Sequence, residues 1–197
     1  MRTGPSLTDP AFLATLEHQH RLSVDEYHRM VATGLFEDAR LELLEGVIVE
    51  MSPQTPRHAR IIRLLCDAKF VAPPPEFVVQ AQLPLTVAPD SEPEPDVAVV
   101  PRTATEQRDQ HPTTAALVFE VAGESLRKDR LAKSAIYAQA AIPEYVIVNL
   151  TQECLEVHRN PDGEARRYRS VATLTTADRF ESEVVAGFAF AIGELLS

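Results

Sequence analysis

The chain has 197 residues, of which 45% are apolar and 24% are charged, and its formal net charge at pH 7 is -10. This length and apolar content suffice for one sizeable core, so we expect a leader with a short helical pattern over residues 1–20 and a single domain over 21–197. The acidic balance excludes a protein that coats nucleic acid with a basic surface, but it does not exclude an enzyme that acts on DNA through locally placed cations.

The N-terminal sequence contains no uninterrupted apolar stretch of the signal-peptide type, and no segment approaches the length that crosses a membrane. We therefore expect a cytoplasmic protein with no membrane partner. The two cysteines, Cys66 and Cys154, form no CxxC motif, so neither a disulfide framework nor a structural zinc site is indicated. Both thiols are expected to be buried apolar groups.

The first clear helix signal lies in RLSVDEYHRMVATG. Ser23 can act as the N-cap with Glu26 as its capping-box partner three residues later, and Gly34 can end the helix. The next segment, RLELLEGVIVEMS, predicts either two short strands or a helix end that turns into a strand at Gly46. Apolar residues at helical spacing then predict a helix in RHARIIRLLCDAKF.

The segment VAPPPE breaks the chain, and the remaining elements follow it. Strands are predicted at 77–80, 83–87, 97–100 and 116–122, a helix at about 126–140, and further strands at 144–149, 153–159 and 166–171. Some of these strands alternate apolar and polar residues and others are wholly apolar, which with the helices is typical of an α/β (α+β) domain with a mixed sheet. The polar loop RTATEQRDQHPTTA is expected to be solvated surface.

Asp96 stands directly before a valine-rich strand in the stretch SEPEPDVAVVP. Pro93 and Pro95 keep the preceding chain extended and out of any helix. A carboxylate at this strand end has two interpretations: it accepts turn hydrogen bonds, or it joins a second carboxylate on a neighbouring strand to bind a hard cation.

Glu120 is that second candidate, because it follows the apolar run Leu117-Val118-Phe119. A charge embedded in such a run is costly unless it is paired or bound to a cation. The functional interpretation is a metal ligand, and the structural alternative is a carboxylate satisfied by an arginine or by loop amides.

A helix start with a plausible cap at Ser125 follows, and its first turns concentrate positive charge. Such cations can hold a phosphate backbone against the carboxylates. For Lys133 the alternative is an ordinary surface ion pair with Asp129, which lies four residues earlier. The four cations are Arg127, Lys128, Arg130 and Lys133.

Three stretches together resemble the Uma-type family of predicted restriction endonucleases, a branch of the PD-(D/E)xK nuclease superfamily. They are LELLEGVIVEMSPQTPRHARII, EPDVAVV and FEVAGESLRKDRLAKSAIYAQAAIPEYVIV. The resemblance runs from about Leu22 to the end of the chain, including VVAGFAFAIGELL. It implies a restriction-endonuclease-like fold, in which helices flank a mixed central β-sheet.

The resemblance also assigns roles to individual residues. Pro95-Asp96 matches the PD motif and Glu120 the acidic member of the (D/E)xK strand, and with the backbone carbonyl of Val121 they would bind Mg²⁺ or Mn²⁺. The superfamily's usual lysine position, two residues after the glutamate, is Ala122 here. In this branch the next helix supplies a lysine instead, and Lys133 occupies that place.

Further positions match the family with less specific motifs. Of the two acidic residues in LELLEG, Glu42 is the favoured site residue, because Glu45 stands before Gly46 and is explained as a turn residue. His58 and Gln82 match family positions, and a purely structural role is the alternative for each. The candidate substrate-binding residues are thus His58, Gln82, Arg127, Lys128 and Arg130.

These assignments imply a magnesium-dependent endonuclease that hydrolyses DNA. One alternative is a nuclease-fold protein that does not cut and serves as a DNA-binding or regulatory module. A second is a hydrolase that acts on a substrate other than nucleic acid through the same carboxylates. A homodimer would supply two sites for two strands, although no residue indicates it. The chain has no Gly-rich phosphate loop, GxSxG elbow or HExxH motif, and His18 and His20 are too poorly spaced on a helical pattern to form a metal pair.

Overall fold

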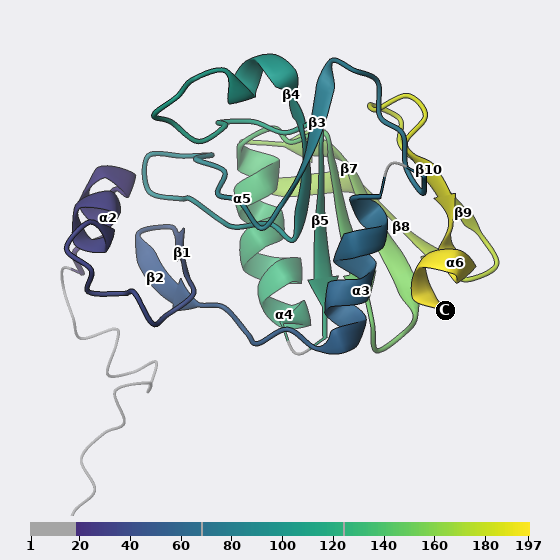
Figure 1. The fold of residues 1–197 in the computed structure, drawn as a ribbon, viewed down its shortest axis with the longest axis horizontal. Coiled ribbons are helices and arrows are strands. Elements are labelled where there is room, and N and C mark those ends of the chain that lie inside the picture. Colours follow the sequence, from purple (N-terminus) through teal and green to yellow (C-terminus); the bar gives the residue numbers. More distant parts are fainter. Residues whose placement is uncertain (1–18, 68, 124) are drawn as a thin grey trace, which may run out of the picture.

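The computed structural model describes residues 19–67, 69–123 and 125–197, so most of the expected leader and His18 lie outside the described residues. At its centre is a six-stranded sheet with the order β3-β4-β5-β6-β7-β8 (Figure 1). β5 and β6 are parallel and the other neighbouring pairs are antiparallel, which confirms the predicted mixed sheet. The strands are β3 (Phe77–Ala81), β4 (Val97–Pro101), β5 (Leu117–Ala122), β6 (Glu144–Asn149), β7 (Cys154–Asp162) and β8 (Arg167–Thr175).

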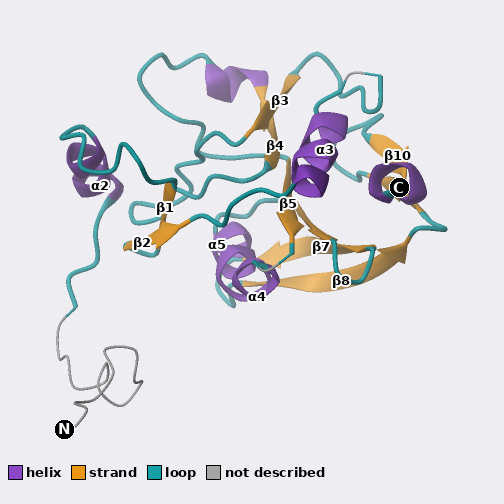
Figure 2. Cartoon of the chain, turned by 60° about the horizontal axis from the view of Figure 1, so that its bottom comes forward, coloured by secondary structure: helices purple, strands orange, loops and turns teal. Residues whose placement is uncertain are grey.

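Both faces of the central strands are covered, which explains why β4, β5 and β6 are apolar over most of their length. One face carries Val97 and Phe119 and packs against α3 (Pro56–Leu65), the β9–β10 pair (Arg179–Glu181, Ala189–Ala191) and α6 (Ile192–Leu196). The other face carries Ala98, Val118 and Tyr145 of β6 and packs against Tyr137 of α5. Figure 2 shows α3 and α5 on the two sides of β5.

The helix that connects β5 to β6 has a five-residue π-helical turn inside it. It consists of α4 (Leu126–Lys128), the π turn Asp129–Lys133 and α5 (Ser134–Gln139), which confirms the helix predicted at about 126–140. The backbone N–H of Ser134 donates to the carbonyl of Asp129, five residues earlier. Such turns are rare and are found often at functional sites.

The N-terminal part of the described chain forms a small unit beside the main sheet. Helix α2 (Val24–Val31) has the predicted capping box between Ser23 and Glu26. A hairpin of β1 (Leu41–Leu44) and β2 (Val47–Glu50) follows, and the strand alternative for this segment is the correct one. Gly46 turns the hairpin at a φ of 73°, and a Cβ there would lie 2.6 Å from the Cβ of Arg21.

Two predictions are wrong. Residues 83–87 form no strand, because Pro84 has no N–H and the amides of Leu85 and Thr86 donate to two separate segments, at Pro93 and Pro112. Cys66 is exposed, because it follows the last residue of α3 as its C-cap, whereas Cys154 is buried as expected.

Three short elements near the C-terminus, β9, β10 and α6, were not predicted. The polar loop after β4 begins with a 3-10 helix, Arg102–Thr105, and its side chains are mostly exposed, as expected. In the described part of the chain, every helix falls short of the length and apolarity needed to cross a membrane.

Candidate active site

Asp96 and Glu120 come together because β4 and β5 are antiparallel neighbours. Val97 pairs with Phe119, so the residue that precedes Val97 and the residue that follows Phe119 continue the same register and face each other. Alternation along β5 puts Glu120 on the face that α4 and α5 cover, whereas Asp96, just before β4, also reaches His58 of α3. The two predicted carboxylates are thus neighbours in space.

Asp96 is 6% exposed and is held by groups from three other segments. Its Oδ1 lies 2.8 Å from Nε2 of His58 on α3 and accepts a long hydrogen bond, 3.5 Å, from Nε2 of Gln82. Its Oδ2 accepts from the backbone N–H of Val121 at 2.8 Å. None of these partners belongs to the turn before β4, so Asp96 is not a simple turn residue, and both family-matched polar residues lie beside it.

Glu120 is 4% exposed and one of its two oxygens is saturated. Its Oε1 accepts hydrogen bonds from Nζ of Lys133 at 2.8 Å and from the hydroxyl of Tyr137 at 2.9 Å. Its Oε2 accepts none from the described residues. Burial raises the pKa of Glu120 well above its usual value, Lys133 opposes that shift, and the carboxylates of Asp129 and Asp96 add to it.

Lys133 is 2% exposed, and the surface ion pair predicted as its alternative is wrong. Its ammonium lies 2.8 Å from Glu120 Oε1 and 2.9 Å from Glu42 Oε2, while Asp129 is itself buried and accepts from the hydroxyl of Ser125. Burial alone would lower the pKa of Lys133, but the carboxylates of Glu120 and Glu42 outweigh it and hold the pKa above its ordinary value. The buried amine is therefore a cation.

Glu42, and not Glu45, reaches this cluster. Glu42 is fully buried on β1 and its Oε1 lies 2.7 Å from Nζ of Lys128. Burial raises the pKa of Glu42, but Lys133 and Lys128 outweigh burial and hold that pKa below its usual value. Glu45 lies in the hairpin turn at a φ of 50° and pairs with Arg166, as a turn residue would.

The basic start of the helix divides into residues with different partners. Lys128 contacts Glu42, and Arg130 forms two hydrogen bonds, of 2.8 and 2.6 Å, with Glu156 on β7. Arg127 is exposed and forms no ion pair with any described residue. The structure therefore does not bring Arg130 to the carboxylates, and Arg127 is the cation at this helix start that remains available to a phosphate.

A cavity of about 40 Å³ adjoins the cluster. Its lining includes Asp96, Glu120, Lys133 and His58, and Met51, Ser52 and Gln54 line it from the segment after β2. That volume accommodates a water-sized species. A larger substrate has to approach from the surface, and only its reacting group would meet the carboxylates.

The sequence model of a family described as "Uma2: Putative restriction endonuclease" matches residues 24–193. The chain belongs to the Uma2 family. Among solved structures, it is similar to one described as a "putative nuclease belonging to DUF820 from Anabaena variabilis", with 12% sequence identity and a TM-score of 0.68. The match covers 89% of this chain and 97% of that chain, and it shows the shared fold. No curated protein matches the sequence.

The donors around the cavity of this Uma2 protein fit a hard divalent cation. Mg²⁺ and Mn²⁺ prefer oxygen ligands and are usually held by one or two carboxylates together with water. Asp96 and Glu120 supply two neighbouring carboxylates, and Glu120 Oε2 accepts no hydrogen bond from the described residues. The raised pKa of Glu120 also indicates that a further cation would stabilise its ionised form.

Tyr137 belongs to the site but was not predicted from the Uma2 sequence. It lies four residues after Lys133, so the two side chains project from one face of the helix and both contact Glu120. The four-residue spacing between Lys133 and Tyr137 is the sequence feature that could have identified Tyr137 as a site residue. Burial raises the pKa of Tyr137 well above its usual value, and the nearby carboxylate of Glu120 adds to this effect, so the hydroxyl remains a donor.

Proposed function

We propose that this Uma2 protein is a magnesium-dependent endonuclease that hydrolyses the phosphodiester bonds of DNA. Its family is described as one of restriction endonucleases, which makes DNA the expected substrate. The observation that carries the proposal is the buried pair Asp96 and Glu120, with the ammonium of Lys133 on one of the glutamate oxygens. Stability alone gives little reason to bury two carboxylates beside a cavity, since buried ion pairs are weak stabilisers.

Asp96 and Glu120 are the residues that would hold the cation, together with the Val121 carbonyl that the family resemblance implies. When bound, magnesium would offset charge on the scissile phosphate and make water a stronger nucleophile. The Val121 amide and His58 fix the orientation of the Asp96 carboxylate. Groups fixed in this way need little rearrangement when charge develops during the reaction.

Lys133 is the residue that meets the phosphate or orients the attacking water. Its ammonium remains charged, and Glu42 and Glu120 hold it from two sides. Ala122, on the strand face where the superfamily's lysine normally stands, is fully buried and carries no amine. The helix therefore supplies the positive charge that the strand lacks, and Tyr137 keeps Glu120 in position.

DNA would approach over the segment after β2 and the start of α4. Arg40, Gln54 and Lys128 line the cavity, and exposed Arg127 directly precedes Lys128 in α4. Local cations of this kind are required, because the net charge of -10 repels a polyanion.

The test is cleavage of supercoiled plasmid by the purified full chain with Mg²⁺ or Mn²⁺, together with calorimetric titration of Mn²⁺. We expect Asp96→Asn and Glu120→Gln to lose both cleavage and Mn²⁺ binding while keeping the far-ultraviolet circular dichroism of the fold. Asp38→Asn is the matched control, since it removes an exposed carboxylate that forms no ion pair with the described residues.

Two results would contradict the proposal. Unchanged Mn²⁺ affinity in both site variants would show that Asp96 and Glu120 hold no metal. If the wild-type protein binds DNA but cleaves it with neither Mg²⁺ nor Mn²⁺, the catalytically silent alternative, a DNA-binding module, would be supported instead.

A further inference from the structure

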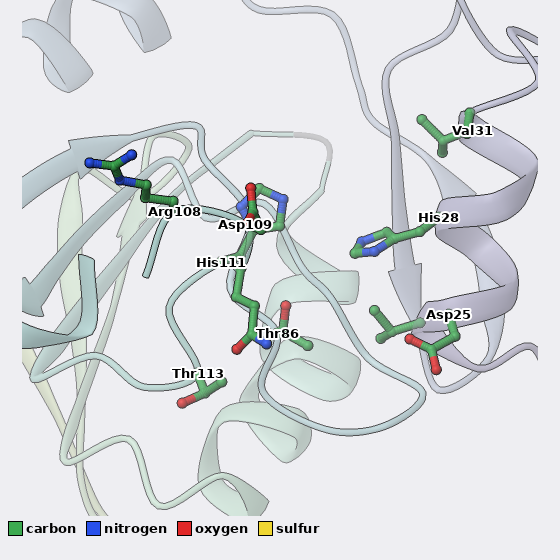
Figure 3. Close-up of a pocket in the computed structure, with 11 residues that line it drawn as sticks. Asp25, His28, Val31, Thr86, Arg108, Asp109, His111 and Thr113 are labelled. Atoms are coloured by element: carbon green, nitrogen blue, oxygen red, sulfur yellow. The ribbon is translucent and has the colours of Figure 1, made fainter. Parts of the chain in front are cut away.

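A second group of possible metal ligands lies outside the candidate active site. His28 comes from α2, Glu92 from the segment before β4, and His111 from the loop between the 3-10 helix and β5. One donor atom from each of these side chains lies within 4.8 Å of the other two. Figure 3 shows His28 pointing from its helix toward the loop that carries His111.

Glu92 is the buried member of this group, with 3% of its surface exposed. Its Oε1 lies 2.7 Å from Nε2 of His28, and its Oε2 accepts a hydrogen bond of 2.5 Å from the hydroxyl of Thr86. Within residues 19–67, 69–123 and 125–197 it forms no ion pair with a lysine or an arginine. A buried carboxylate is costly unless a cation compensates it, and here only an imidazole is in reach.

We propose that His28, Glu92 and His111 form a site for a divalent transition metal, with Zn²⁺ as the ion that fits best. Two imidazoles and one carboxylate are a common protein ligand set for zinc, which leaves the fourth position to water or to a ligand. Imidazole nitrogen does not suit magnesium, so this site and the carboxylate pair select different metals. Thr86 is the outer partner that orients Glu92, as such partners do in known metal sites.

The geometry needs a modest adjustment to admit the ion. Donors at about 2.0–2.1 Å from a tetrahedral zinc lie about 3.4 Å apart. His28 Nε2 and Glu92 Oε1 are now 2.7 Å apart and would separate, whereas the His111 donor lies within 4.8 Å of both and has room to approach. His28 and His111 are both exposed, so their side chains can turn while buried Glu92 stays in place. The fourth position has space, because a cavity of about 660 Å³ lies beside both histidines.

The metal would tie together three segments that are distant in sequence. Glu92 also pairs through its backbone with Leu43, the neighbour of Glu42 on β1. Zinc at this site would therefore fasten the polar loop after β4 and helix α2 to the hairpin that carries Glu42. Zinc would thereby link the part of the chain next to the candidate active site, while its fourth position stays open to water or to a ligand.

The experiment titrates Zn²⁺ into the full chain and follows binding by calorimetry and by the histidine side-chain signals of ¹⁵N-labelled protein. Of the six histidines, we expect those of His28 and His111 to shift, and His28→Ala and His111→Ala each to weaken Zn²⁺ binding by more than about tenfold. Thr86→Val should weaken it by about 10–100-fold through the loss of orientation.

His20→Ala is the matched control, because His20 pairs with Glu26 at 3.1 Å in a histidine–carboxylate contact to which the described residues add no second histidine. Its Zn²⁺ affinity should equal that of the wild type. The proposal is overturned if Zn²⁺ does not bind, if the shifted signals belong to other histidines, or if both His28→Ala and His111→Ala bind Zn²⁺ as the wild type does. Cleavage of DNA is not part of this readout, so the outcome does not depend on the proposed nuclease activity.

Discussion

Replacing Lys133 by methionine removes the charge at the centre of the candidate active site and keeps a long unbranched side chain. The Lys133 side chain is 2% exposed, and its ammonium lies 2.8 and 2.9 Å from the carboxylates of Glu120 and Glu42. Removing one partner of a buried ion pair typically costs about 3–5 kcal/mol, because it leaves an uncompensated buried charge. We expect the free energy of unfolding to fall by about that amount at neutral pH.

The loss depends on pH with a definite sign. The folded pKa of Glu120 is raised above 4.5, so its ionisation destabilises the fold as the pH rises above 4.5, and Lys133 opposes that effect. The folded pKa of Glu42 is lowered, so its stabilising contribution is present above 4.5 and is lost as the pH falls through the folded pKa. Both arguments predict that the deficit of the Lys133→Met variant is largest at neutral pH and shrinks in acid.

Urea denaturation of the full chain at about pH 5 and about pH 7.5 measures this deficit. Lys69→Met is the matched control at an exposed lysine, and its effect should stay within about 0.5 kcal/mol. Adding Glu120→Gln to Lys133→Met should restore part of the stability, since one unpaired carboxylate is then gone. A fall below about 1 kcal/mol at neutral pH, or an equal deficit at both pH values, would refute the compensation argument.

Two further predictions concern DNA. In a filter-binding titration with salt, Arg127→Gln should reduce the slope of log binding constant against log salt concentration by about 0.9, as for one lost phosphate contact. Arg130→Gln should leave that slope unchanged, because Glu156 already holds the Arg130 guanidinium. Equal slopes for the two variants would contradict this prediction. In the plasmid assay, Lys133→Ala should abolish cleavage but spare Mn²⁺ binding. Adding Ala122→Lys should then recover part of the activity in a variant shown to be folded, because overpacking at this buried site costs about 1–3 kcal/mol; full activity of Lys133→Ala would show that its amine is not catalytic.

The sequence was sufficient where one local rule decides the structure. Ser23 and Glu26 predict a helix start because both halves of a capping box lie three residues apart. Apolar runs predict β4, β5 and β6. Asp96 stands directly before one run and Glu120 lies within another, at positions that the register brings together. The family resemblance supplied Lys133, whose buried position was not evident from its charged neighbours in the helix.

The sequence was insufficient where partners distant in the chain decide the outcome. Leu85 is fully buried, and its neighbours have the apolar pattern of a strand, yet the backbone around it donates to separate loops and forms no ladder. Arg130 and Lys128 look equivalent in a list of cations, but Glu156 and Glu42, each from a different strand, give them different roles. Such pairings depend on tertiary contacts that a local pattern does not contain.

The π turn at Asp129–Lys133 sets the rotational phase of the helix that crosses the sheet. In a regular α-helix, residues five positions apart point about 140° away from each other, yet Lys128 and Lys133 both contact the carboxylate of Glu42. The π turn has more residues per turn than an α-helix, so it brings Lys128 and Lys133 closer to the same side of the helix. Deleting one residue inside it would give a more regular helix but would rotate everything after it, including Tyr137, by about 100° relative to Lys128. This helix therefore tolerates substitution at its exposed positions far better than any change in its length.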